Sequence, residues 1–254
     1  MTKKRVGLIT NVCIACVLIG LGVAVWTADL SNLFITVGAP IYNGDREGGK
    51  VSLMFVIDDG VDADSLNGIL KILRGDDTGI KTEATFFIGA KWADRNIENR
   101  NIVKTIARDF EIGNHASSNK SLGKMSEKQQ YNEILLCHAT VYTITAEVTD
   151  IAEAESTFGV EMNLFLPPNG NFNTATLKSA EKLGYRTVKW SRDARGKGVF
   201  TKAVGAGGKD VVAGGDFVLF EPSAETWGRI GHIVADYRDV RGLKIVPVSQ
   251  NIVK

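Results

Sequence analysis

Apolar residues in this chain fall into short runs separated by amphipathic stretches and glycine-containing turns. The clearest run is Leu53 to Ile57, which has the length, branching and aromatic content of a buried strand and leads into two aspartates and Gly60. By the same criteria, further strands are expected at residues 82–88, 111–113, 163–166, 186–190, 216–220 and 244–248. Helices are expected at residues 66–73, 101–108, 126–147, 173–183 and 227–238. Strands that alternate with helices predict a parallel sheet, open or closed into a barrel.

Polar residues and glycines at the ends of these helices support the predicted boundaries. Residues 62–65 offer N-cap side chains for the first helix, and Ser126 with Gln129 resembles a capping box. Gly184 follows a predicted helix in the usual C-cap position. Residues 196–215 are rich in glycine and predict no defined element.

The N-terminus combines a basic flank with a long apolar run. Lys3, Lys4 and Arg5 precede residues 6–26, which carry no charge and are long enough to cross a bilayer core of about 30 Å. We therefore expect residues 1–27 to form a hydrophobic helix that is a signal peptide or a signal anchor, and residues 28–49 to be a connector. The domain at residues 50–254 would then lie in the secretory pathway or at the cell surface, either secreted or attached to the membrane.

Charge and cysteine content exclude several other classes of protein. The chain has 254 residues, of which 44% are hydrophobic, and a formal net charge of +1, so no electrostatic field attracts nucleic acid. Cys13 and Cys16 have the spacing of a redox pair but lie inside the apolar run, and we interpret them as apolar residues of a membrane segment. With Cys137 left over, no disulfide framework is expected.

Asp58 and Asp59 stand directly after the first predicted strand. Parallel sheets and barrels place functional side chains at the carboxyl ends of their strands. A turn at Gly60 allows both carboxylates to face one site, one as a base and one as a metal ligand. An isolated Asp-Asp-Gly triplet is also typical of a polar turn, so its interpretation depends on the rest of the chain.

Six segments occur in the order and spacing of one known family. They are VIDDG at 56–60, ATFFIG at 84–89, EIGNH at 111–115, FLPPNG at 165–170, WSRD at 190–193 and GDFVLF at 215–220. Together they resemble the motifs of the polysaccharide deacetylase family, carbohydrate esterase family 4, whose domain is also called the NodB homology domain. This resemblance implies a distorted (β/α) barrel and metal-dependent removal of acetyl groups from N-acetylglucosamine polymers such as chitin or peptidoglycan.

The resemblance also implies a role for particular residues. In that family a divalent metal, usually zinc, is held by an aspartate and two histidines, and a second aspartate acts as the base. Carried over to this sequence, Asp58 is the base, Asp59 the first metal ligand and His115 the second. From the residues alone, a histidine that only forms hydrogen bonds at a strand end is an equally good interpretation of His115. The substrate-binding residues implied by the resemblance are Pro168, Asn169, Gly170 and Leu219.

Four positions depart from the family pattern. Asn119 replaces the third metal ligand, Leu166 the arginine that orients the base, Lys197 a tryptophan of the acetyl pocket, and Glu221 the histidine that acts as general acid. An amide oxygen is a poor substitute for imidazole at zinc, so we expect a divalent metal to bind weakly or not at all. Glu221 can act as an acid only if burial or a neighbouring carboxylate raises its pKa, and Asp193 is the candidate neighbour.

These departures converge on the predicted site and leave the scaffold motifs in place. They predict a deacetylase-like protein that is inactive or severely impaired and has a glycan-binding or structural role at the cell surface. The alternative is an active metal-dependent hydrolase that acts on N-acetylglucosamine polymers through Asp58, Asp59, His115 and Glu221. A third hypothesis, wall binding without any role for the cleft, predicts that changing Asp58 or His115 leaves glycan affinity unaltered.

Overall fold

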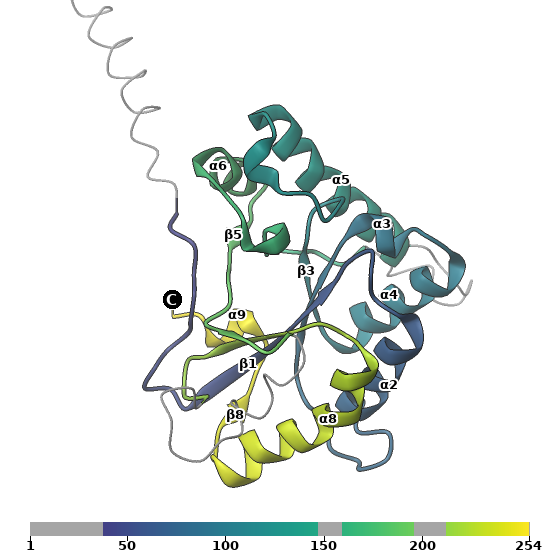
Figure 1. Ribbon diagram of the computed structural model, residues 1–254, viewed down its shortest axis with the longest axis vertical. Helices are drawn as coiled ribbons and strands as arrows, with labels where there is room; N and C mark the ends of the chain where they lie inside the picture. Colours follow the sequence, from purple (N-terminus) through teal and green to yellow (C-terminus); the bar gives the residue numbers. More distant parts are fainter. Residues whose placement is uncertain (1–37, 147–158, 196–211, 254) are drawn as a thin grey trace, which may run out of the picture. The chain divides into compact units, whose positions relative to one another are not determined.

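The computed structural model describes residues 38–146, 159–195 and 212–253 (Figure 1). The apolar segment at residues 6–26 and the predicted pocket position Lys197 lie outside these ranges. Among the helices that are described, none is both long and apolar enough to cross a bilayer.

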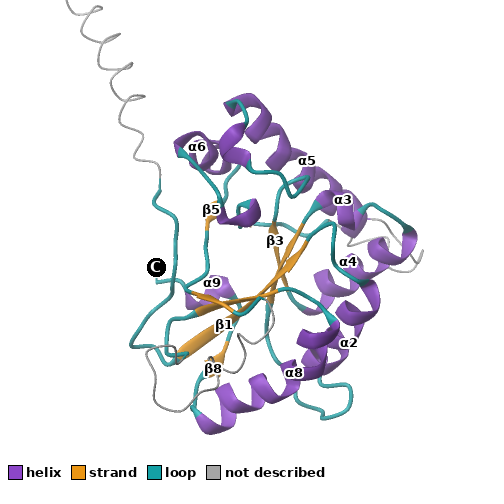
Figure 2. Ribbon diagram, viewed as in Figure 1, coloured by secondary structure: helices purple, strands orange, loops and turns teal. Residues whose placement is uncertain are grey.

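In the described part of the chain, eight strands form one sheet, and every pairing is parallel. The strands are β1 (Lys50–Ile57), β2 (Thr85–Ile88), β3 (Glu111–Asn114), β4 (Leu164–Phe165), β5 (Arg186–Thr187), β6 (Arg192–Asp193), β7 (Phe217–Phe220) and β8 (Lys244–Ile245). Their order is β5-β4-β3-β2-β1-β7-β6, and β8 pairs with the start of β1. Figure 2 shows the strands curling together at the centre, with helices outside them. The predicted distorted (β/α) barrel is confirmed.

Helices connect the strands and cover the outer face of the sheet (Figure 1). They are α2 (Ala63–Arg74), α3 (Ala90–Ala93), α4 (Ile97–Asp109), α5 (Glu127–Ala146), α6 (Thr174–Lys182) and α8 (Ala224–Ala235). The short helix α9 (Val248–Asn251) instead follows the last strand, and its Val248 packs with apolar residues on the inner face of the sheet. Short 3₁₀ turns, η1 (Leu122–Lys124) and η3 (Pro168–Gly170), follow β3 and β4, and a π-helical turn, η4 (Asp236–Val240), extends α8.

The predicted helix caps are present. The Asp62 carboxylate accepts a hydrogen bond from the Ser65 N–H at 2.9 Å and begins α2. Ser126 and Gln129 form a capping box before α5, because each side chain accepts from the backbone N–H of the other residue. Gly184 adopts a φ of 81° after α6, a left-handed conformation that glycine takes without steric cost.

Strand β1 is buried on both faces, which explains its unbroken apolar sequence. Leu53 and Phe55 contribute to the outer core between the sheet and the helices. Met54 and Val56 contribute to a second core inside the curled sheet, together with Leu219 and other apolar residues. Successive side chains of a strand point to opposite faces, so a central strand of a parallel sheet needs apolar residues throughout. The apolar run therefore ends where β1 reaches the rim of the sheet.

Several predicted boundaries were wrong, and the short strand β6 was not predicted. β8 ends at Ile245, because Pro247 has no N–H to donate to a sheet and instead begins α9. Helix α8 begins earlier than predicted, because the Ser223 hydroxyl accepts from the Thr226 N–H at 3.2 Å and caps it. β6 has two residues, too few for the strand periodicity that sequence patterns reveal.

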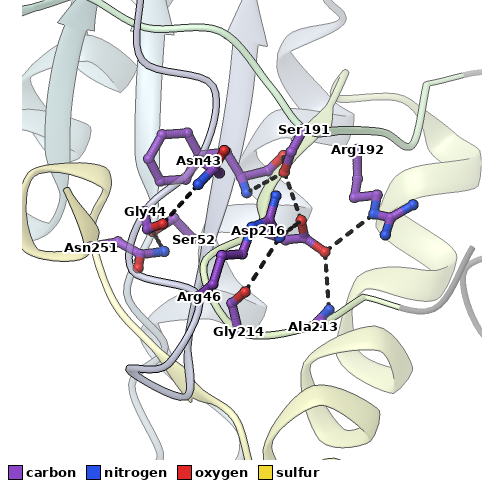
Figure 3. A network of polar contacts seen from close by, with 11 residues as sticks. Asn43, Gly44, Arg46, Ser52, Ser191, Arg192, Ala213, Gly214, Asp216 and Asn251 are labelled. Atoms are coloured by element: carbon purple, nitrogen blue, oxygen red, sulfur yellow. Dashed lines mark hydrogen bonds and ion pairs between the residues drawn. The ribbon is translucent and has the colours of Figure 1, made fainter. Parts of the chain in front are cut away.

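A buried carboxylate fastens the segment before β1 to the sheet (Figure 3). Asp216 lies immediately before β7 and is 0% exposed. Its two oxygens accept from the guanidinium of Arg46 at 2.5 Å, the hydroxyl of Ser191 at 2.8 Å and the guanidinium of Arg192 at 3.2 Å. Because β7 begins at Phe217, this network lies at the amino ends of the strands, opposite the rim that carries Asp58. At that end of a parallel barrel, polar networks serve stability.

Candidate functional site at the carboxyl rim of the sheet

Four predicted site residues lie at the carboxyl ends of parallel strands. Asp58 follows β1, His115 follows β3, Glu221 follows β7, and Asp193 ends β6. The strands β1 and β7 are adjacent, and β2 alone separates β1 from β3. Parallel strands end on a common rim, so the fold gathers these side chains at one edge.

Asn119 forms a hydrogen-bonded bridge across this rim. Its Nδ2 donates to Oδ2 of Asp58 at 2.6 Å, and its Oδ1 accepts from Nδ2 of Asn169 at 3.1 Å. An ionised carboxylate only accepts hydrogen bonds, so the amide nitrogen of Asn119 has to face Asp58. The other Asp58 oxygen, Oδ1, accepts from the Gly60 N–H at 3.1 Å. Both oxygens of the predicted base are therefore engaged by the protein itself.

The predicted first metal ligand, Asp59, interacts with an arginine. The Asp59 carboxylate lies 3.5 Å from the guanidinium of Arg95, which also donates to the Asp59 backbone carbonyl at 2.8 Å. Both side chains are about half exposed, at 48% and 44% respectively. An exposed ion pair of this kind stabilises the protein by at most about 1 kcal/mol, so Asp59 is not firmly held away from a cation.

His115 is 3% exposed and its ring is fixed by the backbone. The Nδ1 atom donates to the Leu166 carbonyl at 2.7 Å, because a carbonyl oxygen only accepts, and Nε2 therefore carries the lone pair. Burial lowers the pKa of His115 from its ordinary value of 6.5 to about 4, although the Leu166 hydrogen bond and the charge of Asp58 act in the opposite direction. His115 is thus a neutral imidazole at pH 7.

This pKa predicts an acid-dependent loss of stability. Between pH 6.5 and about 4, the unfolded chain protonates His115 and the folded chain does not, so the free energy of unfolding falls as the pH falls. A shift of this size corresponds to about 3 kcal/mol across the window. Urea unfolding of the full chain at a series of pH values should show this slope, and His115→Asn should flatten it. An imidazole NMR signal of His115 that titrates near pH 6.5 would contradict the assignment.

Arg195 brings a positive charge to the rim, a role that the sequence analysis missed. Its guanidinium forms two hydrogen bonds with the Asp193 carboxylate, at 2.9 and 2.7 Å, and stacks on the Trp190 ring at 4.8 Å. The hydrogen bond to Asp193 raises the pKa of Arg195, and the charges of Glu221 and Asp58 add to this effect. The Leu166 side chain, at the position of the expected arginine, is fully buried inside the sheet.

The pKa of Glu221 is raised above its ordinary value, which is the direction that a general acid needs. Burial of the carboxyl group is the largest cause, followed by the negative charge of Asp58, and the charge of Arg195 opposes them. The charge of Asp193 also raises the pKa of Glu221 but is the smallest of these causes, and the Asp193 carboxylate is itself hydrogen-bonded to Arg195. Those hydrogen bonds also keep the pKa of Asp193 below its ordinary value, although burial alone would raise it. A proton shared between Glu221 and Asp193 is therefore not the arrangement found.

The four predicted substrate-binding residues differ in their access to the surface. Asn169 is exposed, with a left-handed φ of 56° that presents its side chain to Asn119. Pro168 and Gly170 are buried and shape this turn. Leu219 is 0% exposed and belongs to the inner core beneath the rim.

The residues at the rim do not fit a tightly bound zinc ion. His115 offers one lone pair, at Nε2, and Asp59 offers a carboxylate that an exposed arginine holds only weakly. The third position, Asn119, is a neutral amide whose oxygen and nitrogen are both hydrogen-bonded. Among the described residues, no three His, Cys, Asp or Glu side chains are grouped so that they could hold a metal ion. Zinc sites need three such ligands, so the set is incomplete.

The sequence gives only weak signals for the side-chain contacts of Arg195, Arg95 and Asn119. Arg195 follows Asp193 by two residues, a spacing that suits an ion pair only once the turn after β6 is known. Arg95 and Asp59 come from segments more than one element apart, and no local pattern joins them. The Asn119 bridge depends on the left-handed turn at Asn169, which a Pro-Asn-Gly sequence does suggest.

Comparison with known proteins agrees with this description. A family model described as polysaccharide deacetylase matches residues 44–188. A peptidoglycan-N-acetylglucosamine deacetylase from Bacillus cereus is 31% identical over 140 residues, which cover 55% of this chain and 56% of that protein. The parallel α/β barrel, with polar side chains gathered at the carboxyl ends of its strands, has the architecture of a deacetylase. The match to the family model identifies the family. The chain belongs to the polysaccharide deacetylase family.

Solved structures resemble the fold at lower sequence identity. A pseudoenzyme of carbohydrate esterase family 4 from Bacillus anthracis superposes with a TM-score of 0.68 at 21% identity, over 84% of this chain and 68% of that chain. A mutant of that pseudoenzyme, described as having restored enzymatic activity, has the same TM-score at 22% identity and covers 84% of this chain and 71% of its own. This chain spans about half the length of the Bacillus cereus relative.

Proposed function

We propose that this protein binds polymers of N-acetylglucosamine at the carboxyl rim of its barrel and is catalytically inactive or severely impaired as a deacetylase. The observation that carries the proposal is the pair of hydrogen bonds that Asn119 forms with Asp58 and Asn169. Asn119 donates to the carboxylate of the predicted base, Asp58, and it places a neutral amide at the position where a third metal ligand is needed. A metal-dependent hydrolase needs a free base and a complete ligand set, and the loss of either typically slows the reaction about a hundredfold or more.

Three further observations support this proposal. The family model described as polysaccharide deacetylase matches residues 44–188, and the relative from Bacillus cereus is named as a deacetylase of peptidoglycan N-acetylglucosamine. A structural neighbour with this fold is itself described as a pseudoenzyme. The apolar segment at residues 6–26 favours a location at the cell surface, where such polymers occur.

Acetate release and glycan binding by the same preparation test this proposal. With chitotetraose as the probe, we expect the full chain supplied with zinc to release no more acetate than its Asp58→Asn variant. We also expect chitotetraose to bind, with a dissociation constant in the micromolar to millimolar range. Asn169→Ala should weaken that binding about tenfold, because it removes an exposed amide from the rim.

The matched control is Asn101→Ala, which removes an exposed amide from the surface of α4. Its affinity for chitotetraose should equal that of the unmodified protein. Zinc-dependent acetate release that Asp58→Asn abolishes would contradict the proposed inactivity. No detectable chitotetraose binding would contradict the proposed glycan-binding role.

A residual deacetylase is the second candidate. Two observations favour it: the pKa of Glu221 is raised, and His115 presents a neutral Nε2 atom. In this reading Asp58 accepts a proton and Glu221 returns one to the leaving amine, and bound metal would supply electrophilic polarisation of the acetyl carbonyl. The discriminating result is acetate release that is lost in Glu221→Gln while glycan binding is retained.

A further inference from the structure

Three aromatic rings surround one lysine beside the rim. The Lys189 ammonium lies 5.3 Å from the ring centre of Trp190, 5.8 Å from that of Phe172 and 6.0 Å from that of Tyr42. The rings come from three separate segments: the chain before β1, the loop before α6 and the loop after β5. We call these four residues the aromatic-lysine cluster. Tyr42 is 44% exposed, so the cluster reaches the surface.

The cluster is continuous with the rim. A Cβ atom built on Gly170 would lie 2.5 Å from the Trp190 ring, which shows that this ring packs directly against the turn that carries Asn169. Asn169 in turn contacts Asn119, the partner of Asp58. A glycan seated at the rim and longer than one sugar would therefore extend over the cluster.

The positive charge of Lys189 has no counter-ion in the described part of the chain. Each ion pair of the rim has its own arginine, Arg95 for Asp59 and Arg195 for Asp193. No carboxylate of the described residues comes within ion-pair distance of the Lys189 ammonium, whose neighbours are the three ring faces. An ammonium that contacts only ring faces leaves its hydrogen-bond donors available for a further partner.

We propose that the aromatic-lysine cluster is a subsite for a sugar that carries a carboxylate, next to the N-acetylglucosamine bound at the rim. The apolar C–H face of a pyranose ring packs on aromatic faces, which offer large apolar areas. A carboxylate on that sugar pairs with the Lys189 ammonium, an interaction stronger than a neutral hydrogen bond. The inference rests on the proposed glycan-binding function and narrows it to acidic N-acetylated polymers.

The test compares three tetrasaccharides of equal length on the full chain. They are chitotetraose, which is neutral, the N-acetylglucosamine and N-acetylmuramic acid tetrasaccharide, which carries lactyl carboxylates, and the hyaluronan tetrasaccharide, which carries uronate carboxylates. Calorimetry should show about tenfold tighter binding of a carboxylated probe than of chitotetraose, and this preference should shrink as salt is raised. The carboxylated probe that binds more tightly identifies the source of the carboxylate, and preference for either supports the subsite.

Lys189→Gln should abolish the preference and leave chitotetraose affinity within about twofold. Lys178→Gln, which changes an exposed lysine of α6, is the matched control and should keep the preference. Equal binding of all three probes would overturn the subsite while leaving the proposed function intact. If Lys189→Gln weakens the binding of all three probes equally and also lowers the melting temperature, the cluster has a purely structural role. That result would also overturn the proposed subsite. Absence of binding by every probe would overturn the proposed function as well.

Discussion

Replacing Asn119 with histidine is expected to raise the zinc affinity of the full chain about a hundredfold or more. The substitution adds an imidazole to the neutral Nε2 atom of His115 and the carboxylate of Asp59, and so completes a three-ligand set. The ion pair between Asp59 and Arg95 should not prevent zinc from binding, because an exposed ion pair stabilises the protein by at most about 1 kcal/mol. Isothermal titration with zinc measures the change.

Two variants control this experiment. Asn119→Gln keeps an amide at the position and should leave zinc affinity near that of the unmodified protein. His115→Ala in the Asn119→His background removes the buried imidazole and should cancel the gain. If Asn119→His binds zinc no better than the parent, the geometry of Asp59 and His115, and not the missing imidazole, limits the site, and this part of the account is wrong.

Removing the Asp216 carboxylate is expected to cause the largest loss of stability. Asp216→Ala should lower the free energy of unfolding by about 3 kcal/mol, because the buried carboxylate binds Arg46, Arg192 and Ser191 (Figure 3). This loss of stability lies at the low end of the range for breaking a buried ion pair. Both arginines are partly exposed, so water can solvate them in the variant. Chemical denaturation at pH 7 measures it.

The control is Asp239→Ala, which breaks an exposed pair with Arg238 in η4 and should leave the free energy of unfolding almost unchanged. Burial alone would raise the pKa of Asp216, but hydrogen bonds from Ala213, Arg46 and its other partners hold it below the ordinary value. The stabilisation is therefore present above the unfolded pKa of about 3.9 and is lost as the pH falls through the lower folded value. Equal stability of Asp216→Ala and Asp239→Ala would contradict the role of the network.

Sequence patterns predicted most of the fold because the physical cause of each element is local. The apolar run of β1 predicts a strand buried on both faces, and Asp62, Ser126 and Gly184 predict helix ends through backbone hydrogen bonds of their own segments. These patterns did not predict the order in which the strands pair. The position of β7 beside β1 depends on contacts between residues that are far apart in the sequence.

The candidate site was predicted in part. Motif resemblance identified Asp58, His115 and Asn119, and strand ends explain why they share a rim. The resemblance gave no indication that Asn119 donates to Asp58, because the direction of an amide follows from its neighbours. The charge contributed by Arg195 was missed for a related reason: an arginine's effect depends on where its long side chain reaches, here the Trp190 face and Asp193.

The zinc content of the unmodified full chain tests the central claim most directly. After equilibration with micromolar zinc and removal of the free metal, we expect far less than one zinc ion per chain, because Asn119 leaves the ligand set incomplete. One zinc ion per chain that is lost in both Asp59→Ala and His115→Ala would contradict it.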